Sequence, residues 1–397
     1  MKVGVVGGGV FGLAAAIELQ ARGNKVTLFE RGPIPHPMAT STDVSKGIRR
    51  TWYGNGGPYV DLVERAAHTW REWEEQFGVP IFHQVGGLKI MRSMDPGSPM
   101  YENLRYLESR GADIKILERK KAMSRFPQFV LRENEFALYD KWSGYIESSR
   151  AVELMANKAR DEGVAILDNT PVTGVDEDPS GALVSTHNGP QRFDKAVIAS
   201  GVWSGGLVPQ VGKHLLVTLR EMLLIEVQNP DMFRHEVMPV WSDDPDTAGW
   251  YGFPLMREGI VKISIEGIGE IVHPDVARSG SQEFHDEAME YLRWRIPEMG
   301  RGRGKERKAC LYCATPDDHF VIDWAPGTES LLVATGGSGH GFKFGASIGP
   351  VIADAVEDIE NPFGQYFRIG DRFNIPEQTR SVVDSRGYAI PEQDSLN

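Results

Sequence analysis

The sequence predicts an α/β fold in which a Rossmann-type nucleotide-binding domain carries an inserted α+β domain built on an antiparallel sheet. Three observations support this prediction. A glycine-rich turn joins a strand pattern to a helix pattern at the N-terminus, a second strand-glycine-helix pattern surrounds Gly336–Gly339, and an aromatic-rich stretch of short strands lies between them. The chain has 397 residues, 41% of them hydrophobic and 25% charged, so it can bury a large core and form two or three structural units.

The N-terminus predicts a βαβ unit. Lys2–Val6 is a valine-rich run that is typical of a buried strand, and Leu13–Leu19 consists of strong helix formers. Gly23 and Asn24 end that helix, and Lys25–Glu30 gives a second strand pattern. Dinucleotide-binding folds begin with a unit of about this length.

Between the first strand and the helix, Gly7, Gly9 and Gly12 form a G-x-G-x-x-G fingerprint. In this context we expect Gly7 to make the turn, Gly9 to admit a pyrophosphate, and Gly12 to let the helix pack on the strand. The helix then presents its positive end to the phosphates. Glu30 is expected to bind ribose hydroxyls, which disfavours NADP but does not separate NAD from FAD. A tight strand-helix turn without a ligand is the alternative.

Further patterns divide the rest of the chain. Helices are expected at Tyr59–Phe77, at Arg150–Glu162 and up to Glu357, and strands at Gly86–Ile90, Glu135–Tyr139, Val164–Leu167, Phe193–Gly201 and Leu331–Thr335. Nucleotide-binding patterns at the start, middle and end predict a discontinuous domain of residues 1–85, 142–212 and 307–373. Residues 86–141 and 213–306 are expected to form the substrate domain, the latter as strands alternating with aromatic-rich loops. Residues 374–397 are expected to form a loose or partner-wrapping C-terminal extension.

The charge and the cysteine count exclude several classes of protein. The net charge of −12 argues against nucleic acid or an anionic membrane as a partner, and the basic run Arg301–Lys308 is expected to be a solvated loop. Cys310 and Cys313 are the two cysteines, which indicates a reducing cytoplasm rather than a disulfide framework. The glycine-rich unit explains the nearly uncharged stretch Val3–Leu19 better than a signal peptide does, and no other stretch suffices to span a bilayer.

Two C-terminal motifs, Cys310–Asp323 and Ser338–Phe344, resemble motifs of the monomeric sarcosine oxidase family. These are amine-oxidising flavoproteins of the wider D-amino-acid-oxidase group, which also includes N-methyltryptophan oxidase, pipecolate oxidase and fructosyl-amino-acid oxidases. The resemblance runs from Lys2 to about Glu360. It implies that the Rossmann-type domain binds FAD and that the C–N bond of a secondary amine or amino-acid derivative is oxidised to an imine, with O2 reduced to H2O2.

The resemblance also assigns a role to Cys310. In the family, the cysteine at this place attaches FAD covalently, as a thioether at the 8α-methyl group. Attack by the sulfur requires a thiol that nearby cations help to deprotonate. An inert buried thiol, or half of a redox or metal-binding Cys-x-x-C pair, is the alternative. A metal site would need more ligands, so no metal is predicted, and Cys313 is expected only to pack.

The segment Ser41–Arg49 resembles the family segment that runs from the FAD phosphates to the flavin ring. The resemblance implies that Lys46 takes the basic position over the flavin, where lysine is more like the fructosyl-amine branch. It further implies that Arg49 binds the substrate carboxylate, which a guanidinium can grip with two parallel hydrogen bonds. A register slip would exchange Arg49 with Arg50, and two solvated surface cations are the alternative.

Tyr251–Pro254, followed by Val261–Ile263, resembles the other active-site strand pair of the family, with Tyr251 in the site. Lys262 matches the lysine that contacts flavin N5 through water and promotes the reaction with O2, where a fixed cation stabilises the developing superoxide charge. A lysine that faces solvent is the alternative. Glu266 departs from sarcosine oxidase, which has histidine there. An acid is more like the fructosyl-amine branch and could meet a sugar hydroxyl or a substrate cation, so a small N-methyl amino acid is in doubt.

The remaining implied site residues surround the cofactor. Lys343 is implied as the second carboxylate partner or as a flavin contact, with His340 near the flavin. The other residues expected to bind the cofactor are Val10, Phe11, Arg31, Ser41, Val172, Ser200, Gly201, Trp203, Gly339, Gly341 and Phe342.

The expected protein is therefore a cytoplasmic FAD-dependent amine oxidase, a monomer or small homo-oligomer, whose substrates are O2 and an amine that carries a carboxylate. Three rivals stay open. The enzyme could be a dehydrogenase that feeds a quinone or another protein, an NAD-dependent dehydrogenase, or a flavin-binding protein without catalysis.

Overall fold

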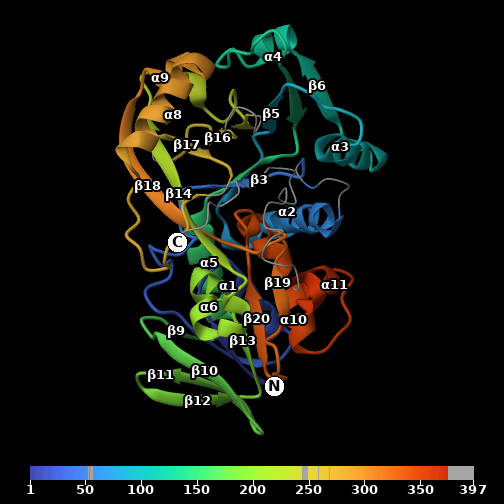
Figure 1. The fold of residues 1–397 in the computed structure, drawn as a ribbon, viewed down its shortest axis with the longest axis vertical. Coiled ribbons are helices and arrows are strands. Elements are labelled where there is room, and N and C mark those ends of the chain that lie inside the picture. The colour runs from blue at the N-terminus through green and yellow to red at the C-terminus, as the bar shows by residue number, and fades with distance from the viewer. Residues whose placement is uncertain (52, 54–56, 244–248, 258, 268, 374–397) are drawn as a thin grey trace, which may run out of the picture.

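The computed structural model describes residues 1–51, 53, 57–243, 249–257, 259–267 and 269–373. Figure 1 shows a six-stranded sheet with its helices in the lower half of the molecule and an eight-stranded sheet in the upper half. A small sheet of β3 (Lys46–Ile48), β8 (Gly144–Ile146) and β4 (Phe82–His83) also forms, and β3 is drawn between the two halves. No described helix is both long enough and apolar enough to cross a membrane. The predicted C-terminal extension, 374–397, lies outside the described residues.

The lower half contains the predicted nucleotide-binding sheet. Its strand order is β19 (Val321–Trp324), β20 (Leu331–Thr335), β13 (Lys195–Ile198), β1 (Lys2–Val6), β2 (Lys25–Phe29) and β9 (Ala165–Leu167). All neighbours pair in parallel except β19 and β20, which are antiparallel. The chain passes from β2 to β9 at one edge and only then returns to β13 on the other side of β1, so the strand order reverses beside β1. Open α/β sheets bind ligands in the crevice at the carboxyl ends of the strands at such a point.

Successive residues of β1 serve two different cores. Val3 and Val5 pack with the four long helices of this half, whereas Val6 packs with the second core on the opposite face of the sheet. The helices are α1 (Val10–Ala21), α2 (Gly57–Phe77), α5 (Ser148–Asp161) and α10 (Gly345–Val356). The second core includes the meander of β10 (Val172–Asp178), β11 (Gly181–Thr186) and β12 (Gly189–Phe193), which the sequence patterns did not predict. The predicted strands and helices of this half are confirmed, with small differences at their ends.

The upper half is built on the second predicted sheet. Its strand order is β18 (Arg303–Ala314), β14 (Leu216–Glu226), β17 (Val261–Ile265), β16 (Trp250–Phe253), β15 (Val240–Ser242), β5 (Gly87–Met91), β7 (Phe136–Asp140) and β6 (Ile114–Glu118). Strands from 86–141 and from 213–306 thus share one sheet, while the domain boundaries themselves stay predictions. The sheet is antiparallel except where β15 and β5 pair in parallel, so it is mixed rather than purely antiparallel.

Two expectations for this half are wrong. Arg303–Lys308 belongs to β18 and pairs with β14, so this part of the basic run is a strand rather than a loop. The region 213–306 also contains α8 (Gln282–Arg295), which packs its apolar side on the sheet. The Ser281 hydroxyl accepts a hydrogen bond from the Phe284 amide at 3.0 Å and so caps the helix. The shorter α-helices among the described residues are α3 (Pro99–Ser109), α4 (Arg119–Arg125), α6 (Ser204–Leu207), α7 (Pro209–Gly212), α9 (Pro297–Gly300) and α11 (Gly364–Phe367).

Candidate active site

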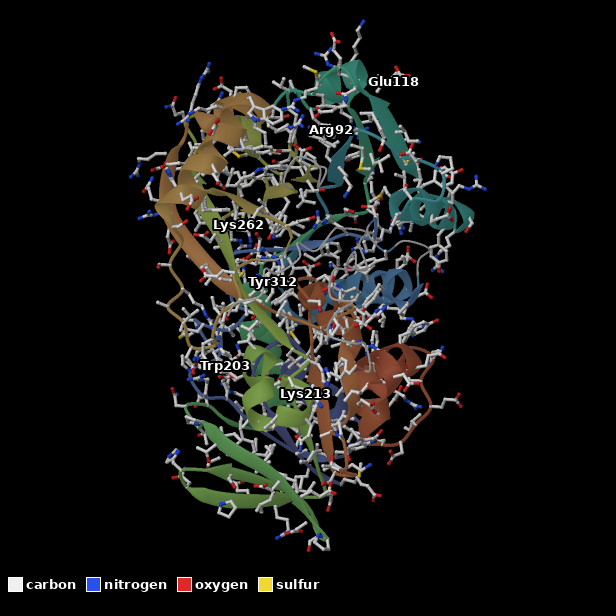
Figure 2. The ribbon with its side chains drawn as sticks, viewed as in Figure 1. Arg92, Glu118, Trp203, Lys213, Lys262 and Tyr312 are labelled. Carbon is white, nitrogen blue, oxygen red and sulfur yellow. The ribbon has the colours of Figure 1, made fainter. Side chains whose placement is uncertain are left out.

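A cavity of about 630 Å³ extends from the glycine-rich turn after β1 to strands β16, β17 and β18. In Figure 2, Trp203 lies in the lower half near α6, Lys262 lies on the eight-stranded sheet, and Tyr312 lies between them. All three residues line the cavity, which therefore connects the two halves of the molecule. Every predicted site residue lines it except Gly12. A Cβ atom on Gly12 would lie 1.9 Å from the Gly7 carbonyl oxygen, as expected for a glycine that lets α1 approach β1.

The glycine-rich turn forms the nucleotide end of the cavity. Gly7 has a φ of +114°, in the region that favours glycine, and a Cβ there would lie 2.5 Å from the Ala199 carbonyl oxygen. The buried Glu30 carboxylate accepts hydrogen bonds from the Gly8 amide at 2.7 Å and the Gly32 amide at 3.3 Å. These backbone bonds fix the Glu30 side chain in the cavity wall, where the sequence pattern expects the ribose hydroxyls.

Arg31 and Trp203 also line the nucleotide end of the cavity. The Arg31 guanidinium lies over the Trp203 ring, 4.7 Å from its centroid. Both side chains bond to Asp275, in the segment between β17 and α8, the indole at 2.8 Å and the guanidinium at 3.2 Å. This segment therefore contacts the pair at the nucleotide end of the cavity. On α1, the Val10 amide donates to the Ser41 hydroxyl at 3.1 Å, which places Ser41 at the start of the helix.

A cluster of two lysines and one aspartate lies at the other end. The Lys262 ammonium donates to the Asp43 carboxylate at 2.7 Å and to the Ser45 carbonyl oxygen at 2.6 Å. The Lys46 ammonium lies 3.2 Å from the same Asp43 oxygen. Lys262 is 2% exposed and its register partner on β16 is Phe253, whose ring centroid is 4.3 Å away. The alternative of a lysine facing solvent is therefore wrong.

The charges in this cluster depend on each other. Burial opposes ionisation of Asp43, but the Lys262 and Lys46 cations outweigh it and hold the pKa of this carboxyl well below its usual value. Burial also disfavours a charged Lys46, but Asp43 raises the pKa of Lys46 above its usual value. At Lys262 burial prevails, helped by repulsion from Lys46, so its pKa is lowered although Asp43 opposes the change.

Cys310 and Tyr312 extend from β18 into the cavity. The Cys310 side chain is buried, and burial raises the pKa of its thiol, while the Lys46, Lys262 and Arg220 cations partly offset this. Tyr312 lies with its hydroxyl 3.4 Å from that of Tyr251, and burial raises its pKa to about 12. Both phenols therefore stay protonated near neutral pH and can donate hydrogen bonds. Cys313 is buried beside Thr335, with 3.6 Å between sulfur and hydroxyl oxygen.

The structure separates the two neighbouring arginines. Arg50 donates to both carboxylate oxygens of Asp140, at 3.1 and 3.2 Å, and to Glu64 at 2.8 Å, and it does not line the cavity. Arg49 does line the cavity, with Nη2 3.4 Å from Glu266 and its guanidinium 5.9 Å from the Tyr251 ring centroid. The side chains of Arg49 and Arg50 are 19% and 11% exposed, so they are not solvated surface cations.

Lys343 and His340 lie on the lower side of the cavity. The Lys343 ammonium donates to the Tyr53 hydroxyl at 2.9 Å and to the His340 carbonyl oxygen at 3.1 Å. The His340 Nε2 atom lies 3.0 Å from the carbonyl oxygen of Asp318. Lys343 is buried and lines the cavity, so besides Arg49 the cavity offers this cation to a substrate carboxylate.

Sequence reasoning missed Asp43, Tyr53 and Tyr312 as parts of the site, although all three line the cavity. Asp43 precedes Lys46 by three residues, and this spacing is a weak signal because such pairs are common in loops. Tyr312 follows Cys310 by two residues on one strand, so both side chains project from the same face, which a strand prediction could have given. Tyr53 has no pattern around it that points to the site.

The cavity fits a flavin dinucleotide. The glycine turn leaves room for phosphates at the start of α1, and a Cβ on Gly339 would lie 2.5 Å from the Tyr312 ring, so its backbone closely approaches the site. At the other end two ammonium groups share one carboxylate, which leaves a net positive charge suited to a ring system that gains negative charge on reduction. Among the described residues, no group of three or more His, Cys, Asp or Glu side chains could hold a metal ion.

Comparison with known proteins defines the class. Residues 2–355 match the family described as DAO, FAD dependent oxidoreductase. The chain belongs to this family and is an FAD-dependent oxidoreductase, which agrees with the Rossmann-type sheet and the glycine turn. The resemblance stated from the sequence motifs is thereby confirmed, and the nicotinamide alternative is not retained.

Two related sequences and two solved structures are similar to this chain over most of its length. N-methyl-L-tryptophan oxidase of Citrobacter koseri is 30% identical over 358 residues, covering 89% of this chain and 94% of the relative. The enzyme of that name from Escherichia coli O127:H6 is 28% identical over 90% of this chain and 95% of its own. The solved structure of fructosamine oxidase (Amadoriase II) from Aspergillus fumigatus has a TM-score of 0.81 at 20% identity, covering 98% of this chain and 94% of its own. L-proline dehydrogenase from P. horikoshii has a TM-score of 0.80 at 22% identity, covering 92% and 96%.

Proposed function

We propose that this enzyme oxidises the C–N bond of a secondary amine or amino-acid derivative to an imine and passes the two electrons to O2, which gives H2O2. One observation carries the proposal: the buried Lys262–Asp43–Lys46 cluster and Arg49 line the same cavity as the glycine turn. The relatives named N-methyl-L-tryptophan oxidase support it. Water then hydrolyses the imine to an amine and a carbonyl compound. A steady-state assay of O2 consumption and H2O2 formation over a panel of N-substituted amino acids tests the proposal. Turnover with artificial acceptors but not with O2 would favour the dehydrogenase rival.

The chain supplies binding and electrostatics for this reaction. Bound FAD is the two-electron acceptor, and it would be held by the glycine turn, Glu30 and the residues around Lys46. Arg49 and Lys343, which both line the cavity, bind the carboxylate of the substrate. Lys262 presents a fixed positive charge where negative charge develops during O2 reduction. His340 fixes the Lys343 ammonium through its carbonyl oxygen, at 3.1 Å.

Glu266 bears on the choice of substrate. Its carboxylate already pairs with Arg49 at 3.4 Å, so a substrate carboxylate that takes this guanidinium competes with it. A substrate with a hydroxyl group or a cation on its nitrogen substituent would offer Glu266 a new partner. We therefore expect a larger N-substituent, of fructosyl or opine type, in preference to a methyl group. The cytoplasm as its compartment, and a monomer or small homo-oligomer as its state, stay predictions.

Replacing Arg49 by alanine is expected to lower kcat/KM for a carboxylate-bearing amine by about tenfold to hundredfold, since a charge-assisted hydrogen bond contributes ~1.5–3 kcal/mol. The loss should fall mainly on KM, as measured by steady-state kinetics. Arg50→Ala is the matched control, because Arg50 bonds Asp140 and Glu64 outside the cavity. It should reduce thermal stability and leave KM nearly unchanged. If only the Arg50 variant raises KM, Arg50 rather than Arg49 binds the substrate carboxylate.

We also propose that FAD is attached covalently to Cys310. The sulfur lies in the cavity wall near the Lys46 and Lys262 cations, which favour the thiolate against the effect of burial. After denaturation in acid and ultrafiltration, the yellow colour should stay with the protein, whereas Cys310→Ala should release it into the filtrate. Cys313→Ala is the matched control and should keep the colour bound. Release from the unmodified protein would refute covalent attachment and leave FAD binding itself intact.

A further inference from the structure

Asp43 is the one described carboxylate that contacts both Lys46 and Lys262. Its Oδ2 atom receives the Lys262 ammonium at 2.7 Å and lies 3.2 Å from the Lys46 ammonium. Its Oδ1 atom accepts a hydrogen bond from the Val44 amide at 2.7 Å. Both oxygens are thus engaged, and the residue is only 7% exposed, so water cannot readily replace either lysine contact.

The backbone of Asp43 is fixed as firmly as its side chain. Its carbonyl oxygen accepts hydrogen bonds from the Ser148 hydroxyl at 2.7 Å, the Ser149 hydroxyl at 2.7 Å and the Ser149 amide at 3.0 Å. These donors belong to the first turn of α5, a helix packed in the core of the lower half. Asp43 therefore connects a rigid helix to a lysine that projects from the sheet of the upper half.

This connection fixes the direction of the Lys262 side chain. Asp43 and the Ser45 carbonyl oxygen take two of the three ammonium protons. Among the described residues no third oxygen or nitrogen accepts from this ammonium, and its remaining side faces the Phe253 ring, whose centroid is 4.3 Å away and which lines the same cavity. Without the Asp43 carboxylate, the two lysines would repel each other in a buried place, and neutralising one of them would relieve the repulsion.

We propose that Asp43 is a positioning residue for the oxidase reaction, the shared counter-ion that keeps Lys262 and Lys46 charged and directs the Lys262 ammonium into the cavity. The inference rests on the proposed role of Lys262 in the reaction with O2. Asp43 itself is not expected to contact the substrate. Two titratable groups outside the cluster face it from the surrounding strands, Tyr251 of β16 and Cys310 of β18; within it, Lys46 lies on β3 and Lys262 on β17. Arg220 of β14 is the register partner of Cys310.

The test follows the protonation of Lys262 directly. The FAD-loaded enzyme is labelled with 13C at lysine Cε, and the Lys262 resonance is identified by its loss in Lys262→Met. In Asp43→Asn the Lys262 pKa should fall by about one to three units relative to the unmodified enzyme, because an opposite charge at this distance contributes that much. The rate of reoxidation of the reduced enzyme by O2, measured by stopped flow, should begin to fall with rising pH at a correspondingly lower pH, because Lys262 loses its proton earlier. Anaerobic reduction by substrate should change much less.

The variants separate the possible failures. If Lys262→Met is reoxidised as fast as the unmodified enzyme, the role of Lys262 is wrong and the inference falls with it. If Lys262→Met is slow but Asp43→Asn shifts neither the resonance nor the pH profile, the inference about Asp43 alone is overturned. Should Asp43→Asn not retain FAD, Asp43→Glu carries the test. This variant keeps the negative charge, so the pH at which its reoxidation rate falls should stay near that of the unmodified enzyme. A shift of this fall to lower pH would contradict the counter-ion role.

Discussion

Replacing Lys262 by methionine is expected to slow the reaction of the reduced enzyme with O2 by about 10²–10³-fold, the cost of removing one preorganised electrostatic group from a transition state. The expectation follows from the placement of Lys262, which is 2% exposed, is fixed by two hydrogen bonds and lines the cavity. Methionine keeps most of the volume and loses the charge. Stopped-flow mixing of the substrate-reduced enzyme with O2 measures the effect, and the anaerobic reduction step should change far less.

Lys89 provides a matched control for this variant. It is a buried lysine on β5 of the same sheet and does not line the cavity. Lys89→Met is therefore expected to lower stability and to leave the O2 reaction unchanged. Equal slowing in both variants would indicate a general loss of structure, and no slowing in Lys262→Met would exclude Lys262 from the O2 reaction.

Replacing Arg295 by methionine is expected to destabilise the enzyme by about 3–5 kcal/mol, because the buried Glu135 and Asp243 carboxylates would lose the cation that binds them most closely. Arg295 is 0% exposed on α8 and binds both oxygens of Glu135, at 2.7 and 2.9 Å, and Asp243 at 2.9 Å. The Tyr291 hydroxyl donates to the same Asp243 oxygen at 2.7 Å. Unfolding of the FAD-loaded enzyme in urea measures the change.

The same network predicts a pH dependence. Burial opposes ionisation of Glu135, but the bonds from Arg295 outweigh it and lower the pKa of this carboxyl. A carboxyl whose pKa is lower in the folded state stabilises the protein at pH values above its unfolded-state pKa. This stabilisation is lost as the pH falls through the folded-state pKa. The stability difference between the unmodified enzyme and Arg295→Met should therefore shrink in acid. Arg303→Ala, which removes an exposed pair with Glu226, should change stability by about 0–1 kcal/mol at most. A comparable loss in both variants would contradict this account.

The sequence predicted the nucleotide-binding half well because its elements are strongly patterned. A valine-rich strand, a glycine turn and a helix of alanine and leucine leave few alternatives for Lys2–Leu19. The upper half was harder to predict for physical reasons. The parallel pair of β5 and β15 joins residues about 150 positions apart, as the register Leu88 to Trp241 shows, and no local pattern encodes such a contact. In β18 the charged residues Arg303–Lys308 look like a loop, because the strand lies at the edge of the sheet with most of these side chains exposed.

The candidate site shows the same division. Gly7 could be placed because it stands in a motif with a recognisable spacing, and Lys262 because its strand pair resembles a family motif. Asp43 could not, because its importance arises from Lys262, which is 219 positions away in the sequence and 2.7 Å away in space. The choice between Arg49 and Arg50 likewise needed the fold, since only the fold shows that Asp140 takes Arg50.

The most direct test of the proposed amine oxidation is an anaerobic titration of the FAD-loaded enzyme with secondary amino acids, including N-methyltryptophan and fructosyl or opine-type derivatives. A substrate should bleach the yellow flavin absorbance without O2, and admitting O2 should restore the colour with one equivalent of H2O2 for each flavin. A flavin that no amine bleaches would contradict amine oxidation. A flavin that bleaches but does not recover in O2 would support an amine substrate and indicate a dehydrogenase rather than an oxidase.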